Sequence, residues 1–442
     1  ALVQWRGLCQ GRDVNALMTA GQLINWGMPA LAADMLNALD CQRTLPLYLQ
    51  ASLLPKAERG ELVVKAIDAF PQFVRFPNTL EEVAALESIE ECWFARHLLA
   101  CFYYNKRSYG KAIALWQRCV EMSPEFADGW RGLAIHAWNK QHDYELAARY
   151  LDNAYQLAPQ DARLLFERDL LDKLSGVTPE KRLARLENNL EIALKRDDMT
   201  AELLNLWHLT GQADKAADIL ATRKFHPWEG GEGKVTSQFI LNQLLRAWQH
   251  LDAREPQQAS ELLHAALHYP ENLSEGRLPG QTDNDIWFWQ AVCANAQGDE
   301  TEAMRCLRLA ATGDRTINIH SYYNDQPVDY LFWQGMALRL LGEQHTAQQL
   351  FSEMKQWAKE MAKTSIEADF FAVSQPDLLS LYSDLQQQHK EKCLMVAMLA
   401  AAGLGEVAHY ESARAELMAI NPAWPKAALF TTVMPFIFSY VH

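Results

Sequence analysis

The chain has 442 residues, of which 49% are hydrophobic and 22% are charged, and its formal net charge is −14 at pH 7. This composition is typical of a folded protein, and the acidic balance argues against nucleic-acid binding, because phosphate backbones bind clusters of Lys and Arg. The longest apolar runs, 393–404 and 427–441, fall short of the ~18 uninterrupted residues of a membrane span. We therefore expect neither nucleic acid nor membrane as a partner.

The N-terminus carries no recognisable export signal. Residues 1–5 lack the basic start and long apolar core of a signal peptide. The eight cysteines contain no C-x-x-C pair, and we expect them to be small buried side chains in a reducing, cytoplasmic protein. The missing initiator Met suggests a fragment of a longer protein, and removal of that Met is the alternative explanation.

The first 90 residues predict degenerate helical hairpins, because small and apolar residues recur only loosely, as at Leu17, Ala20 and Gly21. Residues 91–160 fit two regular 34-residue tetratricopeptide units, each a pair of antiparallel helices. The first unit, from Trp93, has bulky and small residues in register, and the second, from Ala127, has one extra residue in its turn. Pro124 and Pro159 close the units, 35 residues apart.

The rest of the chain continues the helical pattern with longer connections. Residues 161–223 predict looser hairpins, and 224–442 predict further repeats with long inter-repeat loops and a C-terminal cap. Strand signals are almost absent. We therefore predict an all-α protein, one continuous α-solenoid of about nine or ten tetratricopeptide-like hairpins wound as a right-handed superhelix.

The first helices of such hairpins line a concave groove, and here the lining is strongly aromatic. Two interpretations stay open for these rings: they form the core of a tightly wound superhelix, or they form an apolar surface that another domain or chain covers. The basic residues with which some tetratricopeptide grooves clamp a peptide carboxylate are lacking. The predicted partner-binding residues are Tyr104, Trp138, Trp248, Phe288, Trp289, Phe332 and Trp333.

Four connections, at 224–234, 269–285, 311–329 and 363–377, are far longer than the usual two to eight residues. In a solenoid they fall on one edge, and long loops on a rigid scaffold often carry function. A binding edge, plain structural packing, and a sugar site with glycosidic acid–base chemistry are the alternatives. The residues of this edge are His226, Trp228, Glu229, Glu232, Arg277, His320, Tyr322, Tyr323 and Asp325.

Motifs for cofactors and catalysis are not found. Gly233-Lys234 is followed by Val235, and the first glycine of a phosphate-binding loop is missing. The pair His264 and His268 has a zinc-compatible spacing on one helix face, but no third ligand is in view. We expect no cofactor, no metal site and no enzymatic activity of the chain itself.

Several phrases resemble the repeat half of large bacterial tetratricopeptide proteins. They are residues 226–233 (His-Pro-Trp-Glu-Gly-Gly-Glu-Gly), 276–278 with 284–285, and 326–329. Those proteins carry an uncharacterised β-rich N-terminal domain that looks related to sugar-active β-sandwiches. The resemblance covers roughly residues 90 to 420, and it implies that this chain is the C-terminal helical half of such a protein.

The sequence thus favours a non-enzymatic scaffold. It would dock a protein or peptide, including the N-terminal domain of its own parent chain, through the aromatic groove or the loop edge. The alternative is the helical half of a carbohydrate-active protein whose loop edge completes a sugar site. Loop carboxylates gathered in one pocket would favour the alternative, and scattered ones would favour the scaffold.

Overall fold

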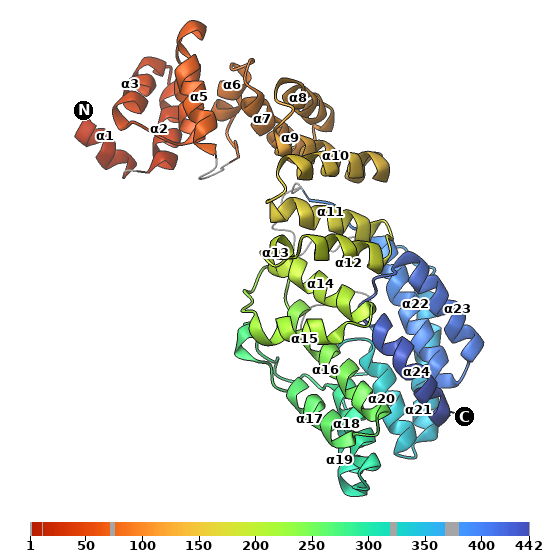
Figure 1. Ribbon diagram of the computed structural model, residues 1–442. Coiled ribbons are helices and arrows are strands. Elements are labelled where there is room, and N and C mark those ends of the chain that lie inside the picture. Colours follow the sequence, from red (N-terminus) through yellow and green to blue (C-terminus); the bar gives the residue numbers. More distant parts are fainter. Residues whose placement is uncertain (1, 11, 71–75, 319–324, 367–379, 442) are drawn as a thin grey trace. The chain divides into compact units, whose positions relative to one another are not determined.

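The computed structural model describes residues 2–10, 12–70, 76–318, 325–366 and 380–441 (Figure 1). These residues form 24 α-helices joined by turns and loops, with no strand among them. The all-α prediction is confirmed, with consecutive helices packed as hairpins. The chain divides into two compact units: unit 1 contains residues 1–168 and 370–382, and unit 2 contains 169–369 and 383–442. One continuous solenoid through both units stays a prediction.

Unit 1 consists of short helical hairpins, of which α7 with α8 and α9 with α10 are the regular repeats. Its last helix, α11, crosses the boundary to unit 2. The elements are α1 (Leu2–Cys9), α2 (Asp13–Asn25), α3 (Pro29–Leu39), α4 (Thr44–Ser52), α5 (Gly60–Asp68), α6 (Leu80–Glu87), α7 (Trp93–Asn105), α8 (Tyr109–Met122), α9 (Ala127–His136), η3 (Ala137–Gln141), α10 (Tyr144–Leu157) and α11 (Ala162–Leu174).

Proline ends the second helix of two hairpins, as the sequence predicts. Helix α8 ends two residues before Pro124 and α10 two residues before Pro159. The residue before each proline, Ser123 or Ala158, has nearly the same backbone angles, φ −140° and ψ 79° in one, φ −134° and ψ 66° in the other. A proline ring disfavours helical angles in the preceding residue, so the same chemistry closes each unit.

Unit 2 continues with longer helices and longer connections. Its elements are α12 (Pro179–Asn188), α13 (Leu190–Ala193), α14 (Asp197–Leu209), α15 (Ala213–Thr222), α16 (Lys234–Asp252), α17 (Pro256–Ala266), α18 (Asn284–Ala296), α19 (Glu300–Ala310), α20 (Tyr330–Leu340), α21 (Gln344–Met361), α22 (Leu385–Leu404), α23 (Val407–Ile420) and α24 (Ala427–Val441).

The apolar C-terminal segment forms helix α24, which packs against α14, α16 and α22 (Figure 1). Its Phe430 ring lies 5.8 Å from the Trp333 ring and 5.7 Å from the Trp424 ring, measured between centroids and stacked in both cases. Six residues further on, Phe436 lies 5.2 Å from Trp248 and 5.7 Å from Trp289. The chain's own last helix therefore covers the aromatic rings of unit 2.

Most of the predicted groove residues are buried. Tyr104, Phe288, Trp289, Phe332 and Trp333 are all buried, each at most 3% exposed. Trp138 and Trp248 are half-buried. Of the two interpretations of these rings, their burial fits the core. Among the predicted groove residues of unit 2, Trp248 alone keeps a partly exposed surface, and Trp289 and Trp333 lie against α24.

Two further findings concern the cysteines and the lengths of the apolar helices. All eight cysteines are buried and free, as expected for small core side chains. None of the helices in the described parts of the chain combines the length and the apolar character that crossing a bilayer requires.

Candidate functional site

A cavity in unit 2 has a volume of about 580 Å³ and is built mostly from the long connections. The loop after α15, the loop between α17 and α18, and the loop before α20 each contribute to its wall, and the start of α16 and α24 complete it. Cavities of this size hold small ligands or the side chains of a partner. Its polar and aromatic lining includes Trp228, Glu229, Glu232, Tyr269, Glu275, Asp285, Asp325, Tyr330 and Lys426.

A glycine holds Trp228 in place at one wall. A Cβ atom on Gly231 would lie 2.0 Å from Cε2 of Trp228, so the indole rests directly on the backbone of its own loop. Glu275 joins this loop to the next one, because its Oε2 accepts hydrogen bonds from the Gly233 N–H at 3.1 Å and from the Thr236 hydroxyl at 3.2 Å. These hydrogen bonds connect the loop after α15 with the loop between α17 and α18, so the two loops form one continuous wall of the cavity.

Helix α18 begins under the pocket with a buried polar sequence, Asp283-Asn284-Asp285. The Asn284 amide donates to the carbonyls of Ala310 and Thr312, both at 2.7 Å, which fixes the loop after α19. Arg277 pairs with the Asp283 carboxylate. Burial raises the pKa of Asp283, and the Arg277 guanidinium opposes that rise. The first residues of α18 are thus held in place by hydrogen bonds and by an ion pair.

Asp285 is the unusual group of the site. Burial, together with the nearby carboxylates of Asp329 and Asp283, raises its pKa to about 7, although the Lys426 ammonium opposes the shift. Lys426 comes from the turn before α24 and pairs with Asp329. Burial alone would lower the pKa of Lys426, but Asp329 and Asp285 outweigh burial and raise it. The pocket therefore contains a carboxyl group that changes charge near neutral pH.

The structure brings together part of the predicted loop edge. Trp228, Glu229, Glu232 and Asp325 all line the pocket. His226 does not; its ring Nδ1 lies 3.2 Å from Oδ2 of Asp197. Arg277 is engaged by Asp283 and by the Gln281 carbonyl. His320, Tyr322 and Tyr323 lie outside the described residues.

Sequence reasoning missed three charged groups of the pocket, Glu275, Asp285 and Lys426. Asp285 carries a local signal, since two aspartates flank an asparagine where a helix begins with an apolar face. Lys426 carries none, because it joins the site only when the C-terminal helix folds back onto α16. Among the described residues, no group of three or more His, Cys, Asp or Glu side chains is placed to hold a metal ion.

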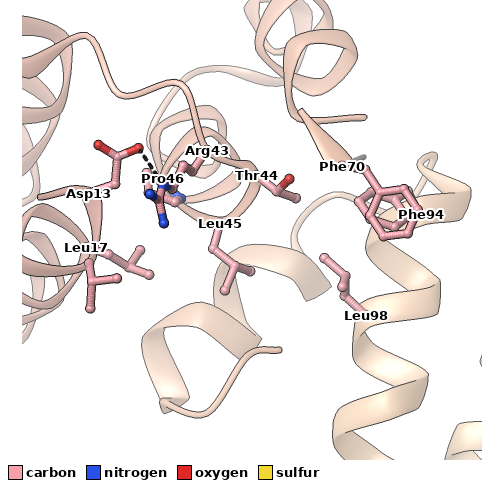
Figure 2. A pocket seen from close by; sticks show the side chains of 10 residues that line it. Asp13, Leu17, Arg43, Thr44, Leu45, Pro46, Phe70, Phe94 and Leu98 are labelled. Atoms are coloured by element: carbon pink, nitrogen blue, oxygen red, sulfur yellow. Dashed lines mark ion pairs between the residues drawn. The ribbon is translucent and has the colours of Figure 1, made fainter. Parts of the chain in front are cut away.

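Unit 1 has a smaller cavity between α2, α4 and α7 (Figure 2). Its walls are mainly apolar, from Leu17, Leu45, Phe94 and Leu98, and an ion pair between Arg43 and Asp13 lies at one side. The volume, about 20 Å³, has room for a single water molecule. We therefore place the candidate site in unit 2.

Two stretches of the chain match the family model of the tetratricopeptide repeat, residues 97–162 and 244–315. The chain contains tetratricopeptide repeats. The first stretch coincides with the two regular units expected at 91–160, and the second covers α16 to α19. Such repeats are typical of protein-interaction scaffolds.

Three solved structures are similar at low sequence identity. The P58(IPK) TPR domain is 15% identical and has a TM-score of 0.25, with 77% of this chain and 93% of that chain covered. Naa15/Naa10 bound to HypK is 14% identical with a TM-score of 0.35, covering 86% and 52%. The APC/C hetero-tetramer Cut9-Hcn1 is 13% identical with a TM-score of 0.24, covering 98% and 83%.

Proposed function

We propose that this chain is a non-enzymatic interaction scaffold that docks a partner domain or protein through the loop-built pocket of unit 2. The observation that supports docking is a cavity of about 580 Å³ enclosed by three long connections, with Trp228 in its wall, in a chain that contains tetratricopeptide repeats. The carboxylates gathered there, Glu229 and Glu232 from one connection and Asp325 from another, meet the criterion set from the sequence for the carbohydrate alternative, which therefore stands as a second candidate function. The aromatic groove is the weaker candidate, because α24 already fills it in unit 2.

The lining suggests what a partner would present. Five carboxyl groups and one ammonium group face the cavity, those of Glu229, Glu232, Glu275, Asp285, Asp325 and Lys426. Trp228 adds a flat aromatic face beside them. A basic side chain reaching into such a pocket gains charge-assisted hydrogen bonds and a cation–π contact. We therefore expect a partner with an exposed Arg or Lys at its centre, and the parent chain's own N-terminal domain stays a candidate.

Site-specific photocrosslinking tests this. A photoreactive residue at position 229, in the full-length protein in its own cells, should give a discrete crosslinked product, and the same residue at exposed position 300 should not. Glu232→Lys should abolish that product by charge repulsion, whereas Glu300→Lys should leave it. Equal crosslinking from positions 229 and 300, or a product indifferent to Glu232→Lys, would contradict the docking site.

A second candidate function is carbohydrate binding, and the same lining favours it. Sugar-binding sites commonly set an aromatic face beside carboxylates that accept from hydroxyl groups, as Trp228 lies beside Glu229 and Glu232. Glycosidic chemistry also needs a carboxylic acid that stays protonated near neutral pH, and Asp285, with its pKa raised to about 7, meets that need.

Calorimetric titration with a panel of mono- and oligosaccharides separates the two functions. Binding that is lost in Glu229→Gln/Glu232→Gln and kept in Glu300→Gln would establish the sugar site. If no sugar binds at millimolar concentration while the crosslinked partner persists, the scaffold function stands alone.

A further inference from the structure

Helix α9 does not end as an ordinary repeat helix, because it continues into the π turn η3 (Ala137–Gln141). The turn closes at His142, whose φ is +54°. It accommodates the extra residue by which the second repeat exceeds the first. A π turn redirects the side chains that follow it and occurs frequently at functional sites. Here it directs Trp138, Asn139 and Lys140 toward one short segment, residues 380–382.

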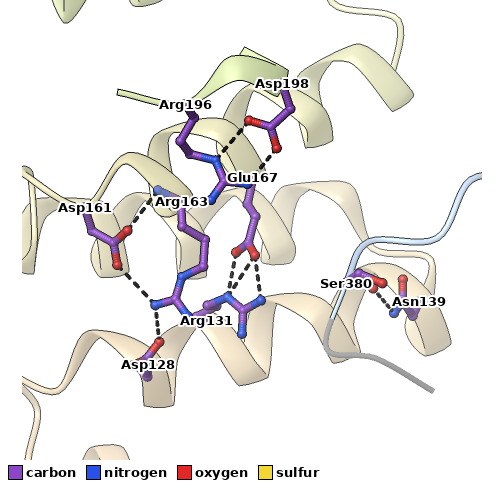
Figure 3. Close-up of polar contacts among 9 residues, drawn as sticks. All are labelled: Asp128, Arg131, Asn139, Asp161, Arg163, Glu167, Arg196, Asp198 and Ser380. Carbon is purple, nitrogen blue, oxygen red and sulfur yellow. Dashed lines mark hydrogen bonds and ion pairs between the residues drawn. The ribbon is translucent and has the colours of Figure 1, made fainter. Parts of the chain in front are cut away.

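Asn139 binds the main chain of that segment at two points. Figure 3 shows the contact with Ser380. Its Oδ1 accepts from the Tyr382 N–H at 2.9 Å, and its Nδ2 donates to the Ser380 carbonyl at 2.8 Å. One residue of a neighbouring parallel strand would bond a backbone in this same pattern. Trp138 adds a third bond, from Nε1 to the Tyr382 carbonyl at 2.9 Å. All three bonds go to backbone atoms, so they do not depend on side chains.

The repeat itself holds the amide of Asn139 in this orientation. Asn139 is 8% exposed, and its Nδ2 also lies 3.2 Å from the hydroxyl of Tyr104. Tyr104 is fully buried against the ring of Trp116, 5.5 Å away between centroids. The binding groups are therefore fixed by the core of unit 1, which lowers the entropy cost of binding a segment.

Two features of the site favour particular side chains in the bound segment, at positions 381 and 382. Leu381 is buried, with 7% of its surface exposed. The Lys140 ammonium lies over the Tyr382 ring at 5.4 Å and over the Tyr109 ring at 4.4 Å, an arrangement that favours an aromatic residue after the leucine. Residues 380–382 group with compact unit 1, although the chain from residue 383 onward belongs to unit 2. The segment thus lies on unit 1 as a ligand would.

We propose that the π turn of unit 1 is a peptide-binding site that recognises the main chain of a leucine–aromatic segment, and that residues 380–382 occupy it as a ligand in cis. This site is separate from the pocket of unit 2 and does not depend on the function proposed for that pocket. A segment of the same chemistry from another protein binds there when the cis copy is removed.

The test uses the full chain and a fluorescent, end-capped peptide, Ser-Leu-Tyr-Ser-Asp-Leu, which copies residues 380–385. A release variant, Leu381→Ser/Tyr382→Pro, removes the buried leucine, the tyrosine ring beside Lys140 and the residue-382 N–H that donates to Asn139. It should free the site and leave the helices intact. Fluorescence anisotropy should show the peptide binding to the release variant at least about tenfold more tightly than to the wild type. Adding Asn139→Ala, which removes two hydrogen bonds to the segment, or methylating the peptide's tyrosine nitrogen, which removes one, should weaken binding at least about tenfold. Gln117→Ala, at an exposed position of α8, should not.

A release variant that keeps its helical circular dichroism but binds no peptide would overturn the proposal, as would equal binding of the methylated peptide. Should the release variant lose its helices, hydrogen exchange decides the question in chains with residues 381 and 382 intact. The Tyr382 amide should then exchange faster in Asn139→Ala than in Gln117→Ala, and equal exchange would overturn the proposal.

Discussion

A Cβ atom on Gly132 would lie 2.3 Å from Cε2 of Trp116, so the fully buried indole of α8 rests on the bare backbone of α9. The two helices of neighbouring hairpins can approach this closely only because the residue has no side chain. We expect Gly132→Ala to lower the free energy of unfolding by about 1–3 kcal/mol through overpacking, as measured by urea denaturation.

The control is Gly110→Ala in α8. A Cβ atom at Gly110 would meet no atom within 4 Å, so this change should be neutral or stabilise the helix by up to about 1 kcal/mol. If both variants have the same stability, close packing at Gly132 is not the reason for the glycine there.

A buried ion pair gives the second prediction. Arg182, fully buried on α12, donates from Nε to Oδ1 of Asp169 at 3.0 Å and from Nη2 to Oδ2 at 2.6 Å. Its Nη2 also lies 3.1 Å from Oε2 of Glu202. Arg182→Met should cost about 3–5 kcal/mol, because it leaves the Asp169 carboxylate buried without its partner.

The double variant Arg182→Met/Asp169→Leu should recover most of that loss, since no uncompensated charge stays at position 169. The exposed pair of Lys65 with Glu61 is the comparison, and Lys65→Met should leave stability nearly unchanged. Thermal unfolding of the three variants measures these effects. A double variant no more stable than Arg182→Met would contradict the charge argument.

The raised pKa of Asp285 predicts a pH dependence. An unfolded aspartate has a pKa near 3.9, whereas that of folded Asp285 is about 7. Between about pH 4 and pH 7 the folded state therefore holds a proton that the unfolded state has released. Its stabilising contribution is complete below pH 4 and is lost as the pH rises through 7.

Asp285→Asn removes this titration. Relative to the variant, the wild type should lose stability from pH 4 to pH 8, by at most about 4 kcal/mol at roughly 1.4 kcal/mol per pKa unit. Denaturation curves at several pH values measure the difference. Parallel pH profiles of the two proteins would show that Asp285 titrates normally.

The fold class followed from the sequence because its causes are local. The small residues at Gly132 and Ala134, the bulky Trp116 between them, and the prolines after each unit act within one hairpin or between neighbours. The extra residue of the second repeat was visible, but its form, a π turn carrying Asn139, depends on packing against Tyr104. The contact with residues 380–382 joins positions 241 residues apart, and no repeat pattern reports such a contact.

The candidate site was predictable only where loops contribute to it. Trp228, Glu229 and Glu232 lie in a connection whose length alone drew attention to it, and solenoid geometry places such connections together. Lys426 reaches the pocket because α24 packs against α14, α16 and α22. The same packing covers aromatic rings of unit 2 for which the repeat register left both a core and a surface role open. The sequence feature that corresponds to this packing is the apolar run at 427–441, which follows the last repeat.

The packing of α24 against the aromatic rings of unit 2 gives the last prediction. Phe430 of α24 lies between Trp333 and Trp424, with interplanar angles of 20° and 13°, and it is 1% exposed. Phe430→Ala should lower the free energy of unfolding by about 3–5 kcal/mol. The rigid indoles of Trp333 and Trp424 cannot move together to fill the cavity that the missing ring leaves. Tryptophan fluorescence should shift to longer wavelength at lower urea concentration than in the wild type.

Leu385→Ala is the comparison within unit 2, since Leu385 is 41% exposed and surface truncations cost little. If Phe430→Ala unfolds like Leu385→Ala, α24 is a loosely held segment, and the aromatic rings beneath it become available to a partner. The expected large loss instead makes α24 part of the fold, so that a partner must use surfaces other than the aromatic groove of unit 2.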